Sequence, residues 1–557
     1  MQSRRFAPFR VFSGLTFCLC IVALARAQSP LVQNPSQPAG ATFTSNADLV
    51  LIPVVVLEGK QHVTGLTKDD FKVMEDGHPQ KIAFARATTG GTELKRVSGD
   101  SLFSNQLQSE GEVPRLTVIA IDTINTSYID RAAARQQIVD YLARSQEHRE
   151  PTALIVFTLT GIQVIHDFTT DPNAVASGVQ KATSNIPDEM PDSFRAAPAT
   201  RLDSKEMEAF ASFTSQADQT FDQYRRRQAI EVLLRSLQML AQSFAGIPAR
   251  KTLVWVTGSV PFPDPTLSET RLNSFQDDMS DLQPLYERTM KQLSDANVAI
   301  YPVDLRGVVV RFPGADAQEM SKKSMDQMST DAHQDAFDRV RLRSFAEQTG
   351  GRSCYGSNDL APCFERANSD SENYYLVGYY RDRKNNKPGW RSLKVSVKQP
   401  GAEVIARKGY FYLTAPADTK EARQSDIESA LVSPVEFTGI QFSVHLSQAA
   451  NSDPKLRNLR FQLQIPPSSL MAEPSGSNRF SLEVVATASA PKGEPVDKLA
   501  QTIEGNAKPD SAASILKAGA SYSNVLRVPA GEYTLRFIVR DNLNGRTGSV
   551  VVPYTVR

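Results

Sequence analysis

Three polar side chains that could bind a ligand come directly after a buried segment. The apolar run Leu116–Ile121 ends at Asp122, and Asn125 and Thr126 follow within four residues. Such a run is typical of a strand buried on both faces of a parallel sheet. In open α/β sheets ligands bind beyond the carboxyl ends of the strands, where these side chains would lie. Helix capping is an equally good interpretation of Asp122 and suits Thr126 better.

A second polar group follows a later apolar strand. Thr257 and Ser259 come after the segment 251–256 and are candidates for the same edge of the sheet. A plain turn from strand to loop explains them as well. We call the predicted partner-binding surface the rim, and its residues are Asp122, Asn125, Thr126, Thr257 and Ser259.

Signatures of common enzymes are absent from the sequence. Its six histidines lack the spacing of zinc proteases, and it has neither a Gly-x-Ser-x-Gly motif nor a phosphate-binding Gly-Lys-Ser/Thr loop. We therefore expect a protein without catalytic residues, which is not an enzyme. Because catalytic groups also assemble from distant parts of a chain, a hydrolase is kept as an alternative.

The first 27 residues have the pattern of a secretory signal peptide. Arginines at positions 4, 5 and 10 precede an apolar stretch at 11–24, and Ala25-Arg26-Ala27 supplies small residues for cleavage. We expect a secreted or periplasmic protein with no membrane span after cleavage; an uncleaved anchor is the alternative. Cleavage removes four arginines and no acidic residue, so the net charge falls from +1 to −3. This charge does not favour nucleic acid as a partner.

Removal of the signal would leave Cys354 and Cys363 as the remaining cysteines. Two cysteines this close in an exported protein favour a disulfide. Closing so short a loop contributes about 2–3 kcal/mol in the chain-entropy model. Free thiols or half of a metal site are weaker interpretations, because no further ligands stand at metal spacing.

The hydrophobic pattern changes along the chain from β-type to alternating strands and helices, and then back. The segment 45–90 is β-rich but too short to close a core alone, so we expect it to pair with the β-rich segment 371–414. The alternating part between them predicts a doubly wound, mostly parallel α/β sheet inserted in a split β-sandwich. The expected divisions are a signal peptide (1–27), a flexible linker (28–44), the first part of the β-sandwich (45–90), an α/β domain (114–370) with a polar insertion at about 183–224, the second part of the β-sandwich (371–414), a linker (415–430) and a C-terminal all-β sandwich domain (431–557).

Eight short segments occur in an order that matches a known protein family. They are Val63–Phe71, Glu75–Gly77, Ile121–Thr126, Arg250–Trp255, Asn297–Asp304, Thr349–Gly351, Tyr374–Tyr379 and Arg407–Tyr410. Through them, residues 48–413 resemble the acidobacterial VWFA-related domain proteins, which are exported proteins built on a von Willebrand factor type A domain. The resemblance implies a Rossmann-like type A fold for the α/β part.

The resemblance also implies a metal site. Type A domains typically hold Mg²⁺ through an Asp-x-Ser-x-Ser motif, a loop threonine and a later aspartate, while a partner's carboxylate completes the shell. Asp122 and Thr126 match the first and third motif positions, but Ile124 replaces the middle serine and Thr257 stands in place of the aspartate. The candidates for the loop threonine are Thr214 and Thr220. What is implied is a degenerate site for Mg²⁺ or another divalent cation at Asp122 and Thr126.

Together these features favour an exported, non-enzymatic binding protein. Its rim would contact another macromolecule, with a protein as the expected partner. The first alternative is a structural component of the envelope or matrix, with an inert rim and β domains that supply assembly contacts. Burial of Asp122 away from any opening would contradict the role of the rim in binding.

Overall fold

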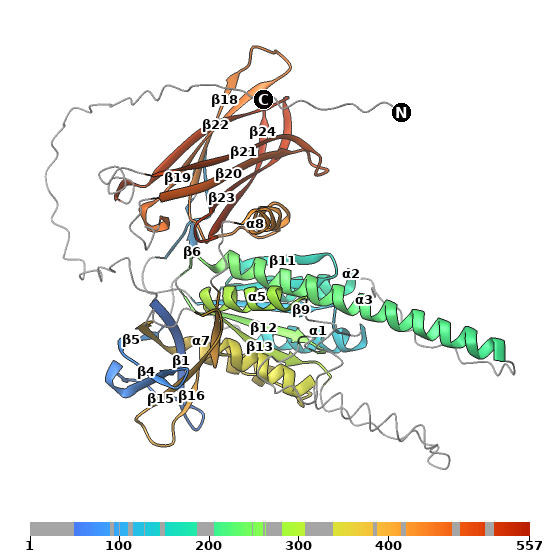
Figure 1. Ribbon diagram of the computed structural model, residues 1–557, viewed down its shortest axis with the longest axis vertical. Helices are drawn as coiled ribbons and strands as arrows, with labels where there is room; N and C mark the ends of the chain where they lie inside the picture. The colour runs from blue at the N-terminus through green and yellow to red at the C-terminus, as the bar shows by residue number, and fades with distance from the viewer. Residues whose placement is uncertain are drawn as a thin grey trace. The chain divides into compact units, whose positions relative to one another are not determined.

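A computed structural model describes residues 49–557, and Figure 1 labels most of their helices and strands. The predicted signal peptide and the linker after it therefore lie outside the described residues. The gaps in the description are residues 90–93, 98, 100, 110–114, 127, 145–150, 186–204, 248, 260–261, 263–280, 307–337, 382–386, 414–418, 471–478 and 507–516.

One sheet of five strands is formed largely by continuous apolar segments. Its strands are β9 (Leu116–Asp122), β10 (Thr152–Thr158), β11 (Gly161–Thr169), β12 (Lys251–Thr257) and β13 (Val298–Asp304). They lie in the order β11-β10-β9-β12-β13, with parallel pairing except for β11, which runs antiparallel to β10 at the edge. β9, β12 and β13 are buried at every position, as expected for strands that are covered on both faces.

Helices pack against both faces of this mixed sheet. On one face lie α1 (Tyr128–Arg144), α2 (Pro172–Asn185) and α7 (Ala361–Glu372). On the other lie α3 (Lys205–Phe244), α5 (Gln283–Asp295) and the helix of residues 338–349. α3 begins inside the predicted polar insertion, and in Figure 1 its N-terminal half extends past the sheet. Among the described helices, none combines the length and the apolar character needed to cross a bilayer.

Two antiparallel sheets combine an early and a late part of the chain. β1 (Leu49–Glu58) and β5 (Ile82–Thr89) pair with β14 (Asn373–Tyr380), and β3 (Phe71–Glu75) pairs with β15 (Gly389–Val397). The short strands β2 (Gln61–His62), β4 (His78–Gln80), β16 (Glu403–Ile405) and β17 (Gly409–Tyr412) complete these sheets.

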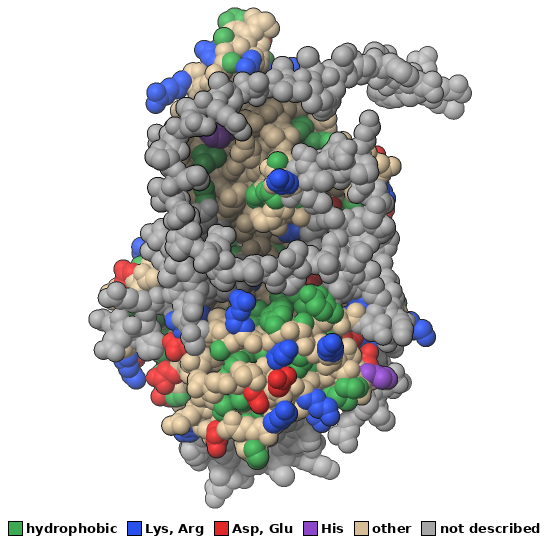
Figure 2. Space-filling model, turned by 90° about the vertical axis from the view of Figure 1, so that its left-hand side faces the viewer, with side chains coloured by type: hydrophobic (Ala, Val, Ile, Leu, Met, Phe, Trp, Pro, Cys, Tyr) green, Lys and Arg blue, Asp and Glu red, His purple; other side chains and the backbone are tan. Residues whose placement is uncertain are grey.

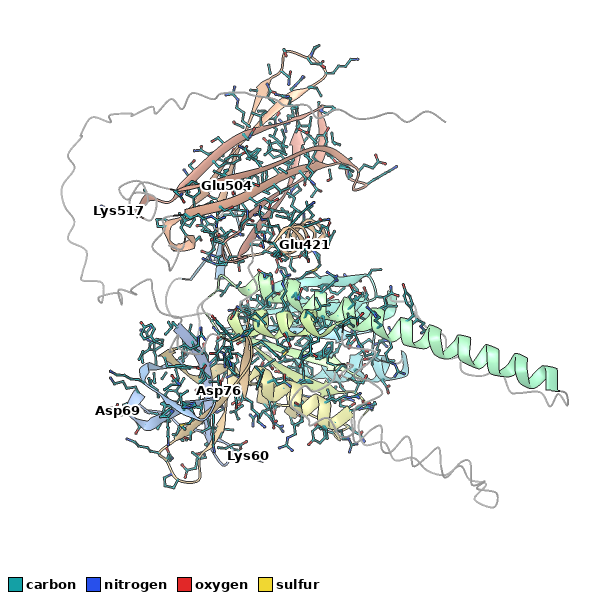
Figure 3. All side chains as sticks on the ribbon, viewed as in Figure 1. Lys60, Asp69, Asp76, Glu421, Glu504 and Lys517 are labelled. Carbon is teal, nitrogen blue, oxygen red and sulfur yellow. A yellow bond between two sulfur atoms is a disulfide. The ribbon has the colours of Figure 1, made fainter. Side chains whose placement is uncertain are left out.

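The turn between β3 and β4 is bonded to β15, the neighbour of β3 in the same sheet. Asp76, labelled in Figure 3, accepts a hydrogen bond from the backbone N–H of Ser392 at 2.9 Å and forms an ion pair with Arg391. Since the inner faces of both sheets share one apolar core, neither segment closes a core without the other.

The last part of the chain, together with the early strand β7, forms two antiparallel sheets that pack face to face. One contains β7 (Leu102–Ser104), β18 (Ser443–Ala450), β19 (Arg457–Ile465) and β22 (Ala520–Val528), in the order β22-β19-β18-β7. The other contains β20 (Arg479–Ser489), β21 (Pro495–Asn506), β23 (Gly531–Asp541) and β24 (Thr547–Val556), in the order β21-β20-β23-β24. The inner faces of the two sheets share an apolar core, as in a β-sandwich.

Two segments without an expected element contain regular structure. The polar stretch 91–113 holds β6 (Leu94–Arg96), β7 and β8 (Leu107–Ser109), and β7 pairs with β18 from the C-terminal sandwich. The predicted linker 415–430 contains most of α8 (Lys420–Val432), whose Ile427 and Ala430 are buried.

The fold class expected for the chain is wrong. Of the six sheets formed by the described residues, five contain antiparallel pairs only, and strands hold more residues than helices. The chain is therefore mostly β, and a doubly wound parallel α/β fold of the von Willebrand type A class does not describe it. The error has a physical source. Buried parallel strands give a strong, continuous apolar signal, whereas half-exposed antiparallel strands give a weaker alternating one.

Candidate functional site

Asp122, the central residue of the predicted rim, ends β9 with 0% of its surface exposed. Its Oδ1 accepts hydrogen bonds from the backbone N–H groups of Ile124 at 2.9 Å and Asn125 at 3.0 Å. Its Oδ2 accepts from Asn125 Nδ2 and Thr257 Oγ1, both at 2.8 Å. Burial raises the pKa of Asp122, while these hydrogen bonds act in the opposite direction. The carboxylate thus organises the turn after β9.

The other predicted rim residues gather around this carboxylate. Thr257, also 0% exposed, places Oγ1 within 2.8 Å of both Asp122 Oδ2 and Ser259 O. Thr126 Oγ1 accepts from the N–H of the residue after Thr257, Gly258, at 2.9 Å. A Cβ at Gly258 would lie 2.6 Å from a backbone oxygen, so this approach requires glycine.

The structure brings the five rim residues together in one cluster. Their polar groups, however, form hydrogen bonds with one another and with Gly258. Only Asn125 and Ser259 are partly exposed. A partner molecule reaches neither Asp122 nor Thr257 in this arrangement. The burial of Asp122 contradicts the expectation that its carboxylate is a contact point of the rim.

The donors in this cluster do not fit the divalent cation that the resemblance implies. Both oxygens of Asp122 already accept two hydrogen bonds each, and Thr257 supplies a hydroxyl in place of a carboxylate. Within the described part of the chain, no group of three or more His, Cys, Asp or Glu residues is arranged to hold a metal ion. The side chains of Thr214 and Thr220 lie outside the described residues.

A second carboxylate at the same edge of the sheet is neutralised inside the protein. Asp304 ends β13 and is 2% exposed. Arg306 Nε and Nη2 donate to its two oxygens, each at 3.0 Å, and Arg306 Nη1 donates to Asp338 at 2.9 Å. The oxygens of both Asp122 and Asp304 are therefore already bonded to donors inside the protein.

The predicted disulfide between Cys354 and Cys363 is confirmed, with 5.9 Å between the two Cα atoms. Cys354 lies beside β13, where its N–H donates to Pro302 O at 2.8 Å. Cys363 lies in the first turn of α7. The bridge therefore fastens α7 to the edge of the mixed sheet.

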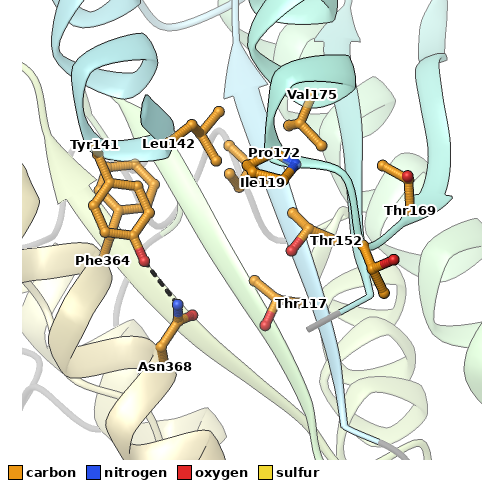
Figure 4. A pocket seen from close by; sticks show the side chains of 11 residues that line it. Thr117, Ile119, Tyr141, Leu142, Thr152, Thr169, Pro172, Val175, Phe364 and Asn368 are labelled. Carbon is orange, nitrogen blue, oxygen red and sulfur yellow. Dashed lines mark hydrogen bonds between the residues drawn. The ribbon is translucent and has the colours of Figure 1, made fainter. Parts of the chain in front are cut away.

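Two pockets near the mixed sheet are poor candidates for a ligand site. The pocket in Figure 4 lies at the start of β9 and β10, beside a hydrogen bond of 2.7 Å from Asn368 Nδ2 to Tyr141 Oη. Its volume of about 30 Å³ admits water but no larger ligand.

A larger pocket of about 430 Å³ is lined by β11, the end of α3 and residues 434–438. Its charged groups are already engaged. Arg536 Nη1 donates to the carbonyls of Ala430 and Ser433, both at 2.9 Å, and Glu436 accepts from the N–H of Val551 at 2.7 Å.

The outer face of the sheet β22-β19-β18 carries a hollow of about 660 Å³. We call this surface the polar hollow, and its polar lining includes His445, Ser447, Arg460, Gln462, Gln464 and Ser523. Part of this face is visible in the upper half of Figure 2, where tan predominates over the colours of charged and apolar side chains.

The strand register arranges these side chains in rows across the sheet. His445 lies opposite Gln462, which lies opposite Ser523, and Ser447 lies opposite Arg460. Neighbouring strands are about 4.8 Å apart, so each row offers closely spaced hydrogen-bonding groups. Among the described residues, Gln462 uses its side chain in a bond to Ser521 at 3.1 Å, and the other five side chains have no hydrogen bond or ion pair.

Sequence reasoning did not identify the polar hollow, although a signal for it exists. In β19 the residues Leu459, Phe461 and Leu463 alternate with Arg460 and with two glutamines. The apolar set is buried and the polar set is exposed. Such alternation indicates a strand with one open face, but it does not show which neighbouring strands extend that face.

Comparisons with known proteins give distant matches only. No protein-family model and no curated protein matches the chain. The pilus adhesin SpaC from Lactobacillus rhamnosus GG, in its open conformation, aligns at 10% identity over 85% of this chain and 56% of that chain, with a TM-score of 0.25. Three N-terminal domains of the type V pili tip protein Mfa5 from Porphyromonas gingivalis align at 9% identity over 86% of this chain and 78% of that chain, with a TM-score of 0.17.

This chain thus spans about half the length of SpaC (56%). TM-scores of 0.25 and 0.17 do not establish a shared fold. None of the comparisons supports the resemblance to the VWFA-related proteins, which stays an expectation from sequence.

Proposed function

We propose that this chain is an exported, non-enzymatic binding protein whose ligand site is the polar hollow. One observation carries the proposal. An open surface of about 660 Å³ presents side chains that are capable of hydrogen bonding, and all of the six named except Gln462 are unused by the described part of the protein. This differs from the rim cluster, where the corresponding groups bond to one another.

The sheet also holds these side chains in a defined arrangement. The inward residues Leu459, Phe461 and Leu463 of β19 are at most 1% exposed and pack in the sandwich core. Binding groups on a packed strand are positioned more accurately than groups on a loop, which lowers the entropy lost when a ligand binds.

The alternative role as a structural component would rely most simply on pairing between exposed strand edges. Side chains already bridge one pair of edges, because Tyr522 Oη donates to Gln501 at 2.7 Å between β22 and β21. On the other side of the sandwich, beyond the end of the pairing of β18 with β7, Gln448 of β18 donates to Thr555 O of β24 at 3.3 Å. The face of the sheet is the more open surface, which favours ligand binding over assembly through strand edges.

Retention on native material tests the proposal. The mature protein, residues 28–557, would be applied to washed envelope and matrix material from the source organism. Ser523→Trp places a large side chain in the polar hollow at an exposed strand position where aromatic residues are well tolerated. We expect this variant to fold, as judged by its melting temperature, and to lose retention.

The matched control is Asn125→Ala, which alters the partly exposed side of the rim cluster. Retention of this variant should equal that of the wild type. If Asn125→Ala abolishes retention while Ser523→Trp leaves it unchanged, the rim cluster is the binding surface and the proposal is wrong.

A further inference from the structure

We infer that the ligand of the polar hollow is an oligosaccharide with carboxylate groups, such as a chain of uronic acid residues. This inference rests on the proposed function and goes beyond it by naming the chemical class of the ligand. It follows from the types of side chain in the polar hollow, their charge and the state of the neighbouring strand edges.

The lining matches the chemistry of a sugar. Ser447 and Ser523 offer hydroxyls, and Gln462 and Gln464 offer amides, each able both to donate and to accept a hydrogen bond. The hydroxyl groups of a sugar need partners with both capacities. Of the three apolar residues that also line the polar hollow, Leu446 and Phe461 are 4% and 1% exposed and only Val525 is partly exposed. An exposed array of neutral donors and acceptors therefore suits a polyhydroxyl ligand better than an apolar one.

The charges in the polar hollow favour an anionic ligand. Arg460 lies in the middle strand, and no Asp or Glu is among the described residues that line the polar hollow. Arg460 also has no ion-pair partner in the described part of the chain. A guanidinium forms a fork of N–H donors that matches the two oxygens of a carboxylate, so an acidic sugar would complete its pairing.

An acidic peptide would match the positive charge of Arg460, but it would not match the other features of the polar hollow. Extended peptides bind most readily by adding a strand to a free sheet edge and by filling apolar pockets with alternate side chains. Here the edge strand β22 already contacts β21 through Tyr522 and through a bond of 2.7 Å from Arg527 N to Asp497. The open surface is the polar face itself, which favours the sugar.

Isothermal titration calorimetry with four defined probes tests the inference. The probes are tetragalacturonic acid, its methyl ester, the neutral sugar cellotetraose and a tetraglutamate peptide. We expect the mature protein to bind tetragalacturonic acid at least about tenfold more tightly than the ester, since a hydrogen bond to a charged group is the stronger kind. The binding should weaken as salt is added.

Three variants separate the contributions to binding. Arg460→Gln should lower affinity for tetragalacturonic acid about tenfold and leave affinity for the ester unchanged. Lys498→Gln removes a positive charge from β21 in the other sheet and should change nothing. Ser523→Trp should abolish binding of both sugars.

The outcomes distinguish this inference from the proposed function. Equal binding of the acid and its ester, binding of the peptide alone, or no binding of any probe would overturn the inference. If Ser523→Trp still lowers retention on envelope material in these cases, the proposed function stands. If Ser523→Trp changes neither probe binding nor retention, both are wrong.

Discussion

Asp122 shows that a carboxylate at the end of a buried strand can serve the fold alone. Its two oxygens accept four hydrogen bonds from the turn after β9 and from Thr257. Its position at the carboxyl end of the strand was predictable from the apolar run that precedes it. Its partners were not, because a ligand and a set of internal N–H and O–H donors satisfy a carboxylate equally well.

Replacement of Asp122 should therefore affect stability and leave binding intact. Asp122→Ala removes an acceptor from the buried hydroxyl of Thr257 and from partly buried N–H groups, and an unpaired buried group costs about 1–3 kcal/mol. We expect a melting temperature several degrees lower, measured by differential scanning calorimetry. Retention on envelope material should match the wild type at a temperature below both transitions. Lost retention with an unchanged melting temperature would contradict this account.

Lys251 is a second buried charge, with a measurable dependence on pH. It is 1% exposed, and its Nζ donates to Ala296 O at 2.7 Å and to Ile247 O. Burial lowers its pKa from 10.5 to about 7. Between these two pH values the unfolded chain binds a proton that the folded protein does not. The free energy of unfolding should therefore rise as pH rises through this window.

Lys251→Met should remove this dependence. The free energy of unfolding of the wild type, minus that of the variant, should increase by a few kcal/mol between about pH 6 and about pH 9.5. Urea denaturation at several pH values measures the difference. The two carbonyls left without a donor lower the stability of the variant at all pH values, so the slope and not the offset is the readout. A flat difference would show that Lys251 does not titrate in this range.

At the scale of single elements, the sequence predicts the strands and helices that are recognisable from the apolar pattern within the element itself. β12 and β13 each contain an apolar run (Leu253–Val256 and Val298–Val303), and the helical stripe from Ile230 to Phe244 is buried as its spacing indicates. β7 was not predictable because it has three residues and pairs with β18, more than 300 positions away in the chain. The polar hollow was missed for the same reason, since three separate strands supply its side chains.

Among features that connect single elements, the disulfide is one for which the sequence predicted both residues. Cys354 and Cys363 lie on either side of the junction between β13 and α7. Mass spectrometry of peptides from the unreduced mature protein should show the two residues linked. The double variant Cys354→Ser/Cys363→Ser should unfold with a free energy about 2–3 kcal/mol lower than that of the wild type. Free thiols in the unreduced protein would refute the bridge.

At the scale of the whole molecule, Asp426 of α8 connects parts that are distant in sequence. Its Oδ2 accepts hydrogen bonds from Arg540 Nε at 3.0 Å and Nη2 at 2.8 Å in β23. Its Oδ1 forms an ion pair with Arg288 of α5. Arg540 is 0% exposed, so Asp426 forms two hydrogen bonds with a fully buried guanidinium.

Removal of Asp426 should therefore cost far more stability than the loss of an exposed charge in the same helix. Asp426→Ala removes the carboxylate that accepts two hydrogen bonds from the buried Arg540, and breaking a buried pair in this way costs about 3–5 kcal/mol. The matched control is Glu421→Ala in the first turn of α8, an exposed residue labelled in Figure 3, whose loss should cost about 0.5 kcal/mol. Calorimetric unfolding of the mature proteins compares the two. Equal effects would mean that other groups stabilise the charge of Arg540 when Asp426 is absent. They would also mean that Asp426 does not link α5 to the sandwich through α8.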